Sequence, residues 1–148
     1  CLLTFECKLH GQQRKTKPPN QPMTKTIIST TEAPAAIGPY SQAVLANDTL
    51  YCSGQIAINP ENGKIIDHSI EAETTQVMRN IGALLQAAEM TYSHVVKASI
   101  FLSSMDHYSK VNEVYSAYFP HNPPAREAVA VKTLPKDVNV EISVIAVR

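Results

Sequence analysis

The sequence lacks the residue spacings that mark metal-binding, nucleotide-binding and membrane proteins. Its 5 histidines and 3 cysteines form no His-x-x-x-His or Cys-x-x-Cys pair, so they predict neither a metal site nor a disulfide framework. It contains no glycine-rich phosphate loop and no Gly-x-Ser-x-Gly turn. No apolar run approaches the roughly 18 residues that a membrane span needs.

The sequence also lacks an excess of either charge. Its 13 basic and 13 acidic residues cancel, which gives no electrostatic argument for binding nucleic acid or an anionic membrane, although a local basic patch is not excluded. Cys52 lies in an apolar run and is expected to be a buried, reduced thiol, as in a cytoplasmic protein.

The 148 residues suffice for one domain with a substantial core, and residues 1–22 differ in composition from the rest. This segment becomes basic and rich in Gln and Pro, and patterned sequence begins at Met23. We expect residues 1–22 to be a flexible extension, added by cloning or by upstream translation, and residues 23–148 to be the functional domain. The alternative is a basic tail that binds nucleic acid.

Strand-like alternation and helical apolar spacing divide residues 23–148 into eight elements. Strands are expected at 26–29, 41–45, 49–53, 94–102, 125–132 and 138–147, with 54–58 as a candidate continuation, and helices at 71–88 and 108–119. This order predicts an α+β fold in which two helices cover one face of a mixed sheet. Because the other face would be bare, we expect a homo-oligomer.

Two charged residues lie inside strands near the end of the chain. Arg126 follows a Pro-Pro pair, and Glu141 lies within the last strand. An arginine fork binds a carboxylate in bidentate fashion, and a nearby carboxylate can hold a water. The alternative is a solvated face or a protected edge strand. Composition does not decide between these interpretations.

Two further positions earlier in the chain are candidates for a pocket. Tyr40 follows Gly38-Pro39 and is either a pocket wall or a packing residue. Gly54 lies in a strand context, which indicates a close backbone approach or a bulge.

Six short motifs follow one another between Met23 and Arg148. They are Ala-Pro-Ala-Ala-Ile-Gly-Pro-Tyr-Ser-Gln-Ala at 33–43, Ser-Gly-Gln-Ile at 53–56, Val-Val-Lys-Ala-Ser-Ile-Phe-Leu at 95–102, Val-Asn-Glu-Val-Tyr at 111–115, Pro-Ala-Arg at 124–126, and Leu-Pro-Lys-Asp-Val at 134–138 with the later Glu141. In this order and spacing they resemble the RidA/YjgF family of enamine/imine deaminases. The resemblance covers nearly all of the chain after residue 22.

This resemblance implies a chorismate-mutase-like homotrimer. Its sheets would form a central barrel with the helices outside, and active sites would lie in the clefts between subunits. The implied activity is hydrolysis of 2-iminobutanoate and 2-iminopropanoate to 2-oxo acids and ammonia, a metabolite damage-control role that needs no cofactor or metal. Besides the small acid and its own copies, the resemblance implies no partner.

The resemblance also assigns roles to individual residues. Arg126 would bind the substrate carboxylate, and Glu141 would position the attacking water. The remaining positions that match the family site are Tyr40, Ser53, Gly54 and Asn112.

The chain departs from the family pattern at two positions directly after the arginine. Many members have a small residue and then a cysteine, where this chain has Glu127 and Ala128. Backbone groups at Ala128 could still contact the substrate. Glu127 should point to the opposite face from Arg126, because neighbouring strand residues alternate.

Two other functions compete with imine hydrolysis. One is an endoribonuclease or translation inhibitor, an activity ascribed to similar proteins. Neutral charge and the lack of a catalytic histidine pair argue against it. The other is a non-catalytic, chaperone-like or carboxylate-sensing trimer, which would keep Arg126 without needing Glu141.

Overall fold

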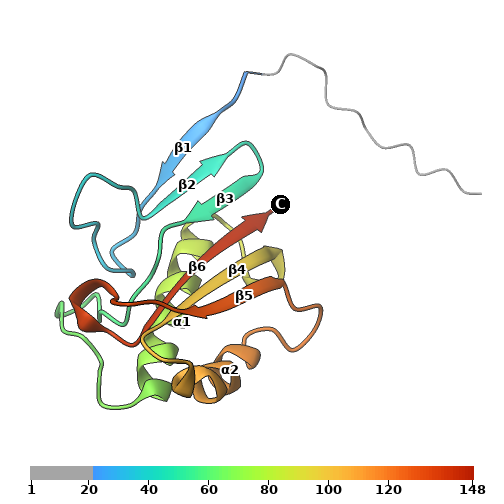
Figure 1. The fold of residues 1–148 in the computed structure, drawn as a ribbon. Helices are drawn as coiled ribbons and strands as arrows, with labels where there is room; N and C mark the ends of the chain where they lie inside the picture. The colour runs from blue at the N-terminus through green and yellow to red at the C-terminus, as the bar shows by residue number, and fades with distance from the viewer. Residues whose placement is uncertain (1–21) are drawn as a thin grey trace, which may run out of the picture.

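The computed structural model describes residues 22–148 as one six-stranded sheet with two α-helices (Figure 1). The expectation for the N-terminal extension therefore lies outside the described residues, apart from Pro22. The elements are β1 Lys25–Ile28, β2 Ala43–Ala46, β3 Thr49–Cys52, α1 Ile70–Ala87, β4 Val95–Leu102, α2 Tyr108–Ser116, β5 Ala125–Ala130 and β6 Val140–Val147, with short 3-10 helices at Tyr92–His94, Met105–His107 and Pro135–Asp137.

The strands are ordered β1-β2-β3-β6-β4-β5, and the sheet is mixed. All neighbours are antiparallel except β4 and β5, which are parallel. The strands that carry Arg126 and Glu141 are therefore not paired, because β4 lies between β5 and β6. The predicted α+β fold with a mixed sheet and two helices is confirmed.

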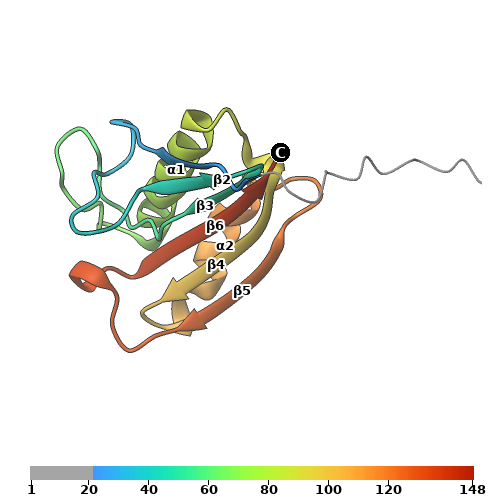
Figure 2. The ribbon, with the colours of Figure 1, turned by 90° about the horizontal axis from the view of Figure 1, so that it is seen from above.

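Both helices lie on the same face of the sheet (Figures 1 and 2). The strands present a continuous apolar surface to them, because alternate side chains point to the same side. On β6, Val140, Ile142, Val144 and Ala146 are buried, whereas Glu141 points to the other side. That second face has no helical cover in the described part of the chain.

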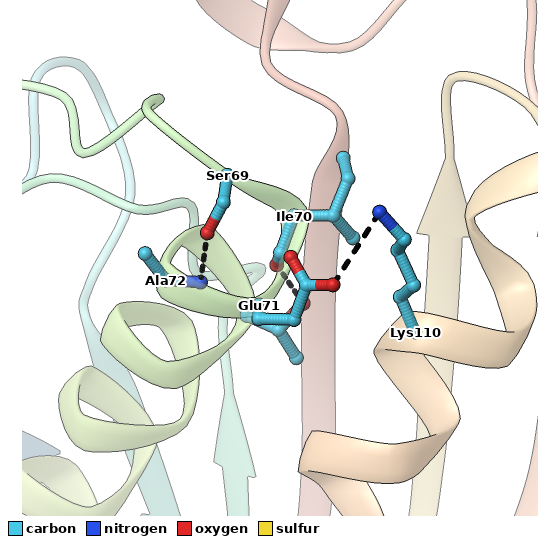
Figure 3. Close-up of polar contacts among 6 residues, drawn as sticks. Ser69, Ile70, Glu71, Ala72 and Lys110 are labelled. Carbon is cyan, nitrogen blue, oxygen red and sulfur yellow. Dashed lines mark hydrogen bonds and ion pairs between the residues drawn. The ribbon is translucent and has the colours of Figure 1, made fainter.

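Helix α1 is capped at its N-terminus and contacts α2 there. Ser69 is the N-cap, and its hydroxyl accepts a hydrogen bond from the Ala72 N–H at 3.1 Å. One residue into the helix, Glu71 forms an ion pair with Lys110 of α2, with 3.4 Å between Oε1 and Nζ (Figure 3). The N-terminus of α1 is therefore tied both to its own backbone and to the second helix.

Several expectations about element bounds were wrong, including the starts of β2, at Ala43 rather than 41, and of β6, at Val140 rather than 138. Residues 54–58 do not extend β3. They form only isolated bridges, from Gln55 to Ile142 and from Ile58 to Ile65. Helix α2 ends at Ser116 rather than Phe119 and continues as tight turns, in which Ala117 N–H bonds the carbonyl of Val114. β5 ends at Ala130 rather than at residue 132.

The single described cysteine behaves as expected. Cys52 is buried and unpaired, and burial raises the pKa of its thiol to about 12. Within residues 22–148, no helix combines the length and apolar character needed to cross a membrane. In the same range, no cluster of His, Cys, Asp and Glu side chains is arranged to hold a metal ion.

Candidate functional site

Four of the predicted site residues meet in one cavity of about 510 Å³, which we call the glutamate pocket. It lies where the end of β3 and the start of β6 face the loop before β2. Its walls are formed by Pro34, Ala35, Ile37, Tyr40, Gln42, Ser53, Gly54, Gln55, Ile56, Ile58, Pro135, Lys136 and Glu141. The resemblance assigns these four residues to one site together with Asn112, Arg126 and Ala128, which do not line this cavity.

Glu141 lies against the backbone of Gly54. A Cβ atom built on Gly54 would be 2.8 Å from Cδ of Glu141, so any side chain there would displace the carboxyl group. The close approach that the glycine predicts is therefore made by the candidate catalytic carboxyl. Burial raises the pKa of Glu141 above its ordinary value, because the charged form is less well solvated there. A carboxyl of this kind is suited to moving a proton.

The outer wall of the glutamate pocket is a loop fixed by one buried amide. The Gln42 side chain accepts a hydrogen bond from Thr30 N–H and donates to the carbonyls of Thr30, Ala33 and Pro34 at 2.7–3.1 Å. This holds the 30–34 segment beside Tyr40.

Two polar side chains of this pocket are already engaged within the fold. The Tyr40 hydroxyl accepts a hydrogen bond from Ile37 N–H at 3.3 Å. Ser53 donates its hydroxyl proton to the carbonyl of Ser41 at 2.6 Å. Ser53 is thus a wall residue whose proton is already used, and nothing in its contacts activates it as a nucleophile.

Lys136 lines the same pocket and was not identified from the sequence. It lies in the turn before β6, in the left-handed region with φ 58°. The signal for it in the sequence was its place inside the Leu-Pro-Lys-Asp-Val motif, five residues ahead of Glu141.

Arg126 lies in a second cavity of about 430 Å³, which we call the arginine pocket. Its Nη1 donates to Oδ1 of Asn112 at 2.7 Å, and its Nη2 donates to the hydroxyl of Tyr108 at 2.8 Å. Its Cζ lies 5.1 Å from the ring centroid of Tyr115. The pocket is lined by Asn112, Tyr115, Ser116, Phe119, Pro123, Pro124 and Arg126.

Asn112, which the resemblance places at the site without a partner, contacts Arg126 directly, while Tyr108 and Tyr115 were missed as site residues. Tyr108, Asn112 and Tyr115 are spaced four and three residues apart, which places them on one face of α2. That spacing was the signal available in the sequence. The Tyr115 hydroxyl is buried without a hydrogen-bond partner among the described residues, and burial raises its pKa to about 12.

The two departures after Arg126 lie on different faces of β5. Ala128 is on the same face as Arg126 and packs at the edge of the core. Glu127 points the other way, where its carboxylate contacts Lys97 and Ser99 on β4. These contacts lower the pKa of Glu127, with the hydrogen bond from Lys97 as the largest cause. Glu127 therefore does not neutralise Arg126 within this chain.

The glutamate and arginine pockets do not meet within one chain. Arg126 is level with Ala98 and Val144 across the sheet, whereas Glu141 is level with Phe101. The two positions are separated by about 10 Å across the strands and about 10 Å along them, and their side chains leave opposite faces. One small molecule cannot contact both groups of the same chain.

A family model and several known proteins match this chain over most of its length. The family model described as Endoribonuclease L-PSP matches residues 30–148. The 2-iminobutanoate/2-iminopropanoate deaminase of Bos taurus is 46% identical over 126 residues, which are 85% of this chain and 92% of the bovine protein. AldR of Lactococcus lactis, provisionally named a regulator, is 50% identical over 120 residues, 81% of this chain and 95% of AldR.

Among solved structures, Escherichia coli TdcF with bound serine superposes with a TM-score of 0.80 at 36% identity, covering 83% of this chain and 98% of the TdcF chain. The matches extend over both pockets, since the family model begins before Tyr40 and ends after Glu141. The chain therefore belongs to the Endoribonuclease L-PSP family, which is the RidA/YjgF family that its six motifs resemble.

Proposed function

We propose that this protein is a cofactor-independent deaminase that hydrolyses 2-iminobutanoate and 2-iminopropanoate to 2-oxo acids and ammonia. The observation that carries the proposal is the environment of Arg126. Its guanidinium is held by two uncharged oxygens and lines a cavity, so it can bind the carboxylate of a small acid. Relatives at 41–46% identity are named for this reaction.

The substrate carboxylate would bind Arg126, and the attacking water would be held by Glu141. As water adds to the imine carbon, Glu141 would accept one of its protons and pass it to the nitrogen, which gives the carbinolamine. As the C=O bond forms, Glu141 would accept the hydroxyl proton and pass it to the same nitrogen, which leaves as ammonia. Imines hydrolyse readily, so orientation and one placed water supply the catalysis needed.

The separation of the two pockets supports a site assembled from two copies of the chain. Arg126 of one copy and Glu141 of another can face one substrate, although the two residues of one copy cannot. The helix-free face of the sheet carries exposed apolar side chains, including Tyr51 and Val129, which are 49% and 44% exposed. We therefore propose the homotrimer with a central barrel, and sites in its clefts. A metabolite damage-control role in the cytoplasm is part of this proposal.

A carboxylate-binding module without catalysis is the second candidate. The name given to AldR favours it, because a regulator would need the arginine pocket but no placed water. The solved TdcF structure contains serine, whose carboxylate is also a feature of the proposed substrates. The two candidate functions differ in whether Glu141 is needed, because only the deaminase requires a positioned water.

A coupled assay distinguishes these functions. A threonine or serine dehydratase generates the imine, and 2-oxo acid formation is followed with the wild-type chain, Arg126→Ala and Glu141→Gln. If the protein is a deaminase, the wild-type chain should accelerate 2-oxo acid formation and both variants should lose this effect. Glu141→Gln should still bind 2-oxobutanoate. Binding without acceleration would establish the carboxylate-binding module. Cleavage of RNA in place of either result would favour the endoribonuclease named in the family description.

A further inference from the structure

Tyr108 contacts the one cationic group on which the proposed function depends. It is the first residue of α2, and its hydroxyl accepts a hydrogen bond from Nη2 of Arg126 at 2.8 Å. Asn112, four residues later on the same helix face, accepts from Nη1 at 2.7 Å. The two terminal nitrogens of the guanidinium are thus tied separately, by two oxygens that one helix presents.

Two hydrogen bonds restrict the orientation of the guanidinium more than one hydrogen bond would. A guanidinium held only through Nη1 can still swing about the bonds of its side chain. A second hydrogen bond at Nη2 fixes the plane of the group as well as its position. The rings of Tyr108 and Tyr115 lie 5.7 and 5.1 Å from Cζ of Arg126 and confine it further.

The anchors leave the binding capacity of Arg126 intact. Each terminal nitrogen carries a second N–H, and Nε carries one more, so three donors remain for a carboxylate. Both anchoring oxygens are uncharged. Within residues 22–148, no carboxylate lies within ion-pair distance of Arg126. The cation is therefore oriented without being neutralised.

We propose that Tyr108 is a positioning residue that orients the Arg126 fork toward the carboxylate of the substrate. This inference rests on the proposed function, because it assigns Arg126 to the substrate carboxylate. Tyr108 would not touch the reacting imine carbon, and it would not affect the water at Glu141, which lies in the other pocket. Its effect should fall on substrate binding more than on turnover.

The test compares Tyr108→Phe with the wild-type chain in the coupled imine assay. The variant keeps the ring and loses only the hydroxyl. We expect KM, and the Kd of 2-oxobutanoate measured by NMR titration, to rise roughly 3- to 10-fold, with kcat within about twofold. The Nε–H signal of Arg126 should also broaden or shift in the variant without ligand.

Two further variants separate positioning from general structural effects. Tyr118→Phe removes a hydroxyl from a tyrosine beyond the end of α2, which packs on Tyr92 with 5.1 Å between ring centroids, and should leave KM unchanged. In an Arg126→Lys background, Tyr108→Phe should add little, because lysine has no second terminal nitrogen to anchor.

The outcomes distinguish this inference from the proposed function. A wild-type chain that neither accelerates imine hydrolysis nor binds 2-oxobutanoate would overturn both. An active wild-type chain with Tyr108→Phe unchanged in KM and Kd would overturn the role of Tyr108 alone. A loss in Tyr108→Phe that follows its melting temperature, or that is equally large in the Arg126→Lys background, would assign Tyr108 a purely structural role and also reject the inference.

Discussion

The carboxyl group of Glu141 lies over the α-carbon of Gly54, in the space that a side chain would fill at any other residue type. A Cβ there would be 3.1 Å from Cγ and 2.8 Å from Cδ of Glu141. Gly54 is held in place by its neighbour, because the backbone of Gln55 exchanges hydrogen bonds of 2.8 and 3.1 Å with Ile142. The glycine therefore sets where the candidate catalytic carboxyl can lie.

Gly54→Ala should displace Glu141 and reduce turnover. The methyl group occupies the place of the carboxyl, whose side chain can rotate away, so the fold should survive. A misplacement of about 1 Å costs up to about 100-fold in rate, and we expect kcat to fall at least about tenfold. Steady-state kinetics in the imine assay measure this, and an unchanged kcat would show that the position of Glu141 does not matter.

Gly63→Ala is a matched control for that experiment. Gly63 has φ +69°, so a side chain strains the backbone, but no atom lies within 4 Å of the added Cβ and the residue does not line the glutamate pocket. This variant should lose stability while it keeps kcat. If kcat fell equally in Gly54→Ala and Gly63→Ala, the loss in Gly54→Ala would be explained by reduced stability and not by the displacement of Glu141.

The pH dependence should report the ionisation of Glu141. Burial raises its pKa above the usual range of glutamate, and water positioning needs the ionised form. Activity is therefore full above the raised pKa and is lost as the pH falls through it. The acid limb of the kcat/KM profile should lie above the pH at which an exposed glutamate titrates. If the residual activity of Glu141→Gln fell over the same acidic pH range, the titration of another group would cause the acid limb.

Glu73 should contribute strongly to stability through the start of β6. It is fully buried in α1 and accepts hydrogen bonds from the backbone N–H groups of Asn139 and Val140 at 2.6 and 3.0 Å. Glu73→Ala leaves these donors unpaired, with an expected cost of roughly 2–5 kcal/mol. Glu73→Gln keeps one acceptor oxygen and should cost less. Denaturant unfolding at matched protein concentration measures both, and a change below about 0.5 kcal/mol in Glu73→Ala would contradict the account.

Local sequence signals predicted most of the fold. The cap at Ser69 and the apolar stripe of α1 depend on neighbours within one or two turns, so they could be recognised without the tertiary structure. The order of the strands in the sheet could not be predicted in this way, because β4 lies between β5 and β6, which follow each other in the sequence. Gly82 illustrates the same limit. The space that it leaves on α1 is taken by the hydroxyl of Tyr92, which comes later in the chain and donates to the carbonyl of Met78.

The site was predictable in its residues but not in its arrangement. Arg126 and Glu141 were noticed by their charge inside apolar strands and Gly54 by its lack of a side chain, and the family resemblance assigned all three to one site. Their distribution over two pockets depends on which face of which strand each residue occupies, and on the position of β4. Tyr108 was missed because a tyrosine at a helix start is usually a packing residue, and its role depends on an arginine 18 residues later.

The claim that one site is built from two copies can be tested by mixing two inactive variants. Arg126→Ala keeps an intact glutamate pocket, and Glu141→Gln keeps an intact arginine pocket. Each variant alone should be nearly inactive. When the two are unfolded together and refolded as a mixture, sites that pair the intact halves should restore about a quarter of the wild-type rate if the copies assemble at random. A mixture as inactive as its components, although its chains do form mixed oligomers, would show that Arg126 and Glu141 do not act on one substrate across an interface.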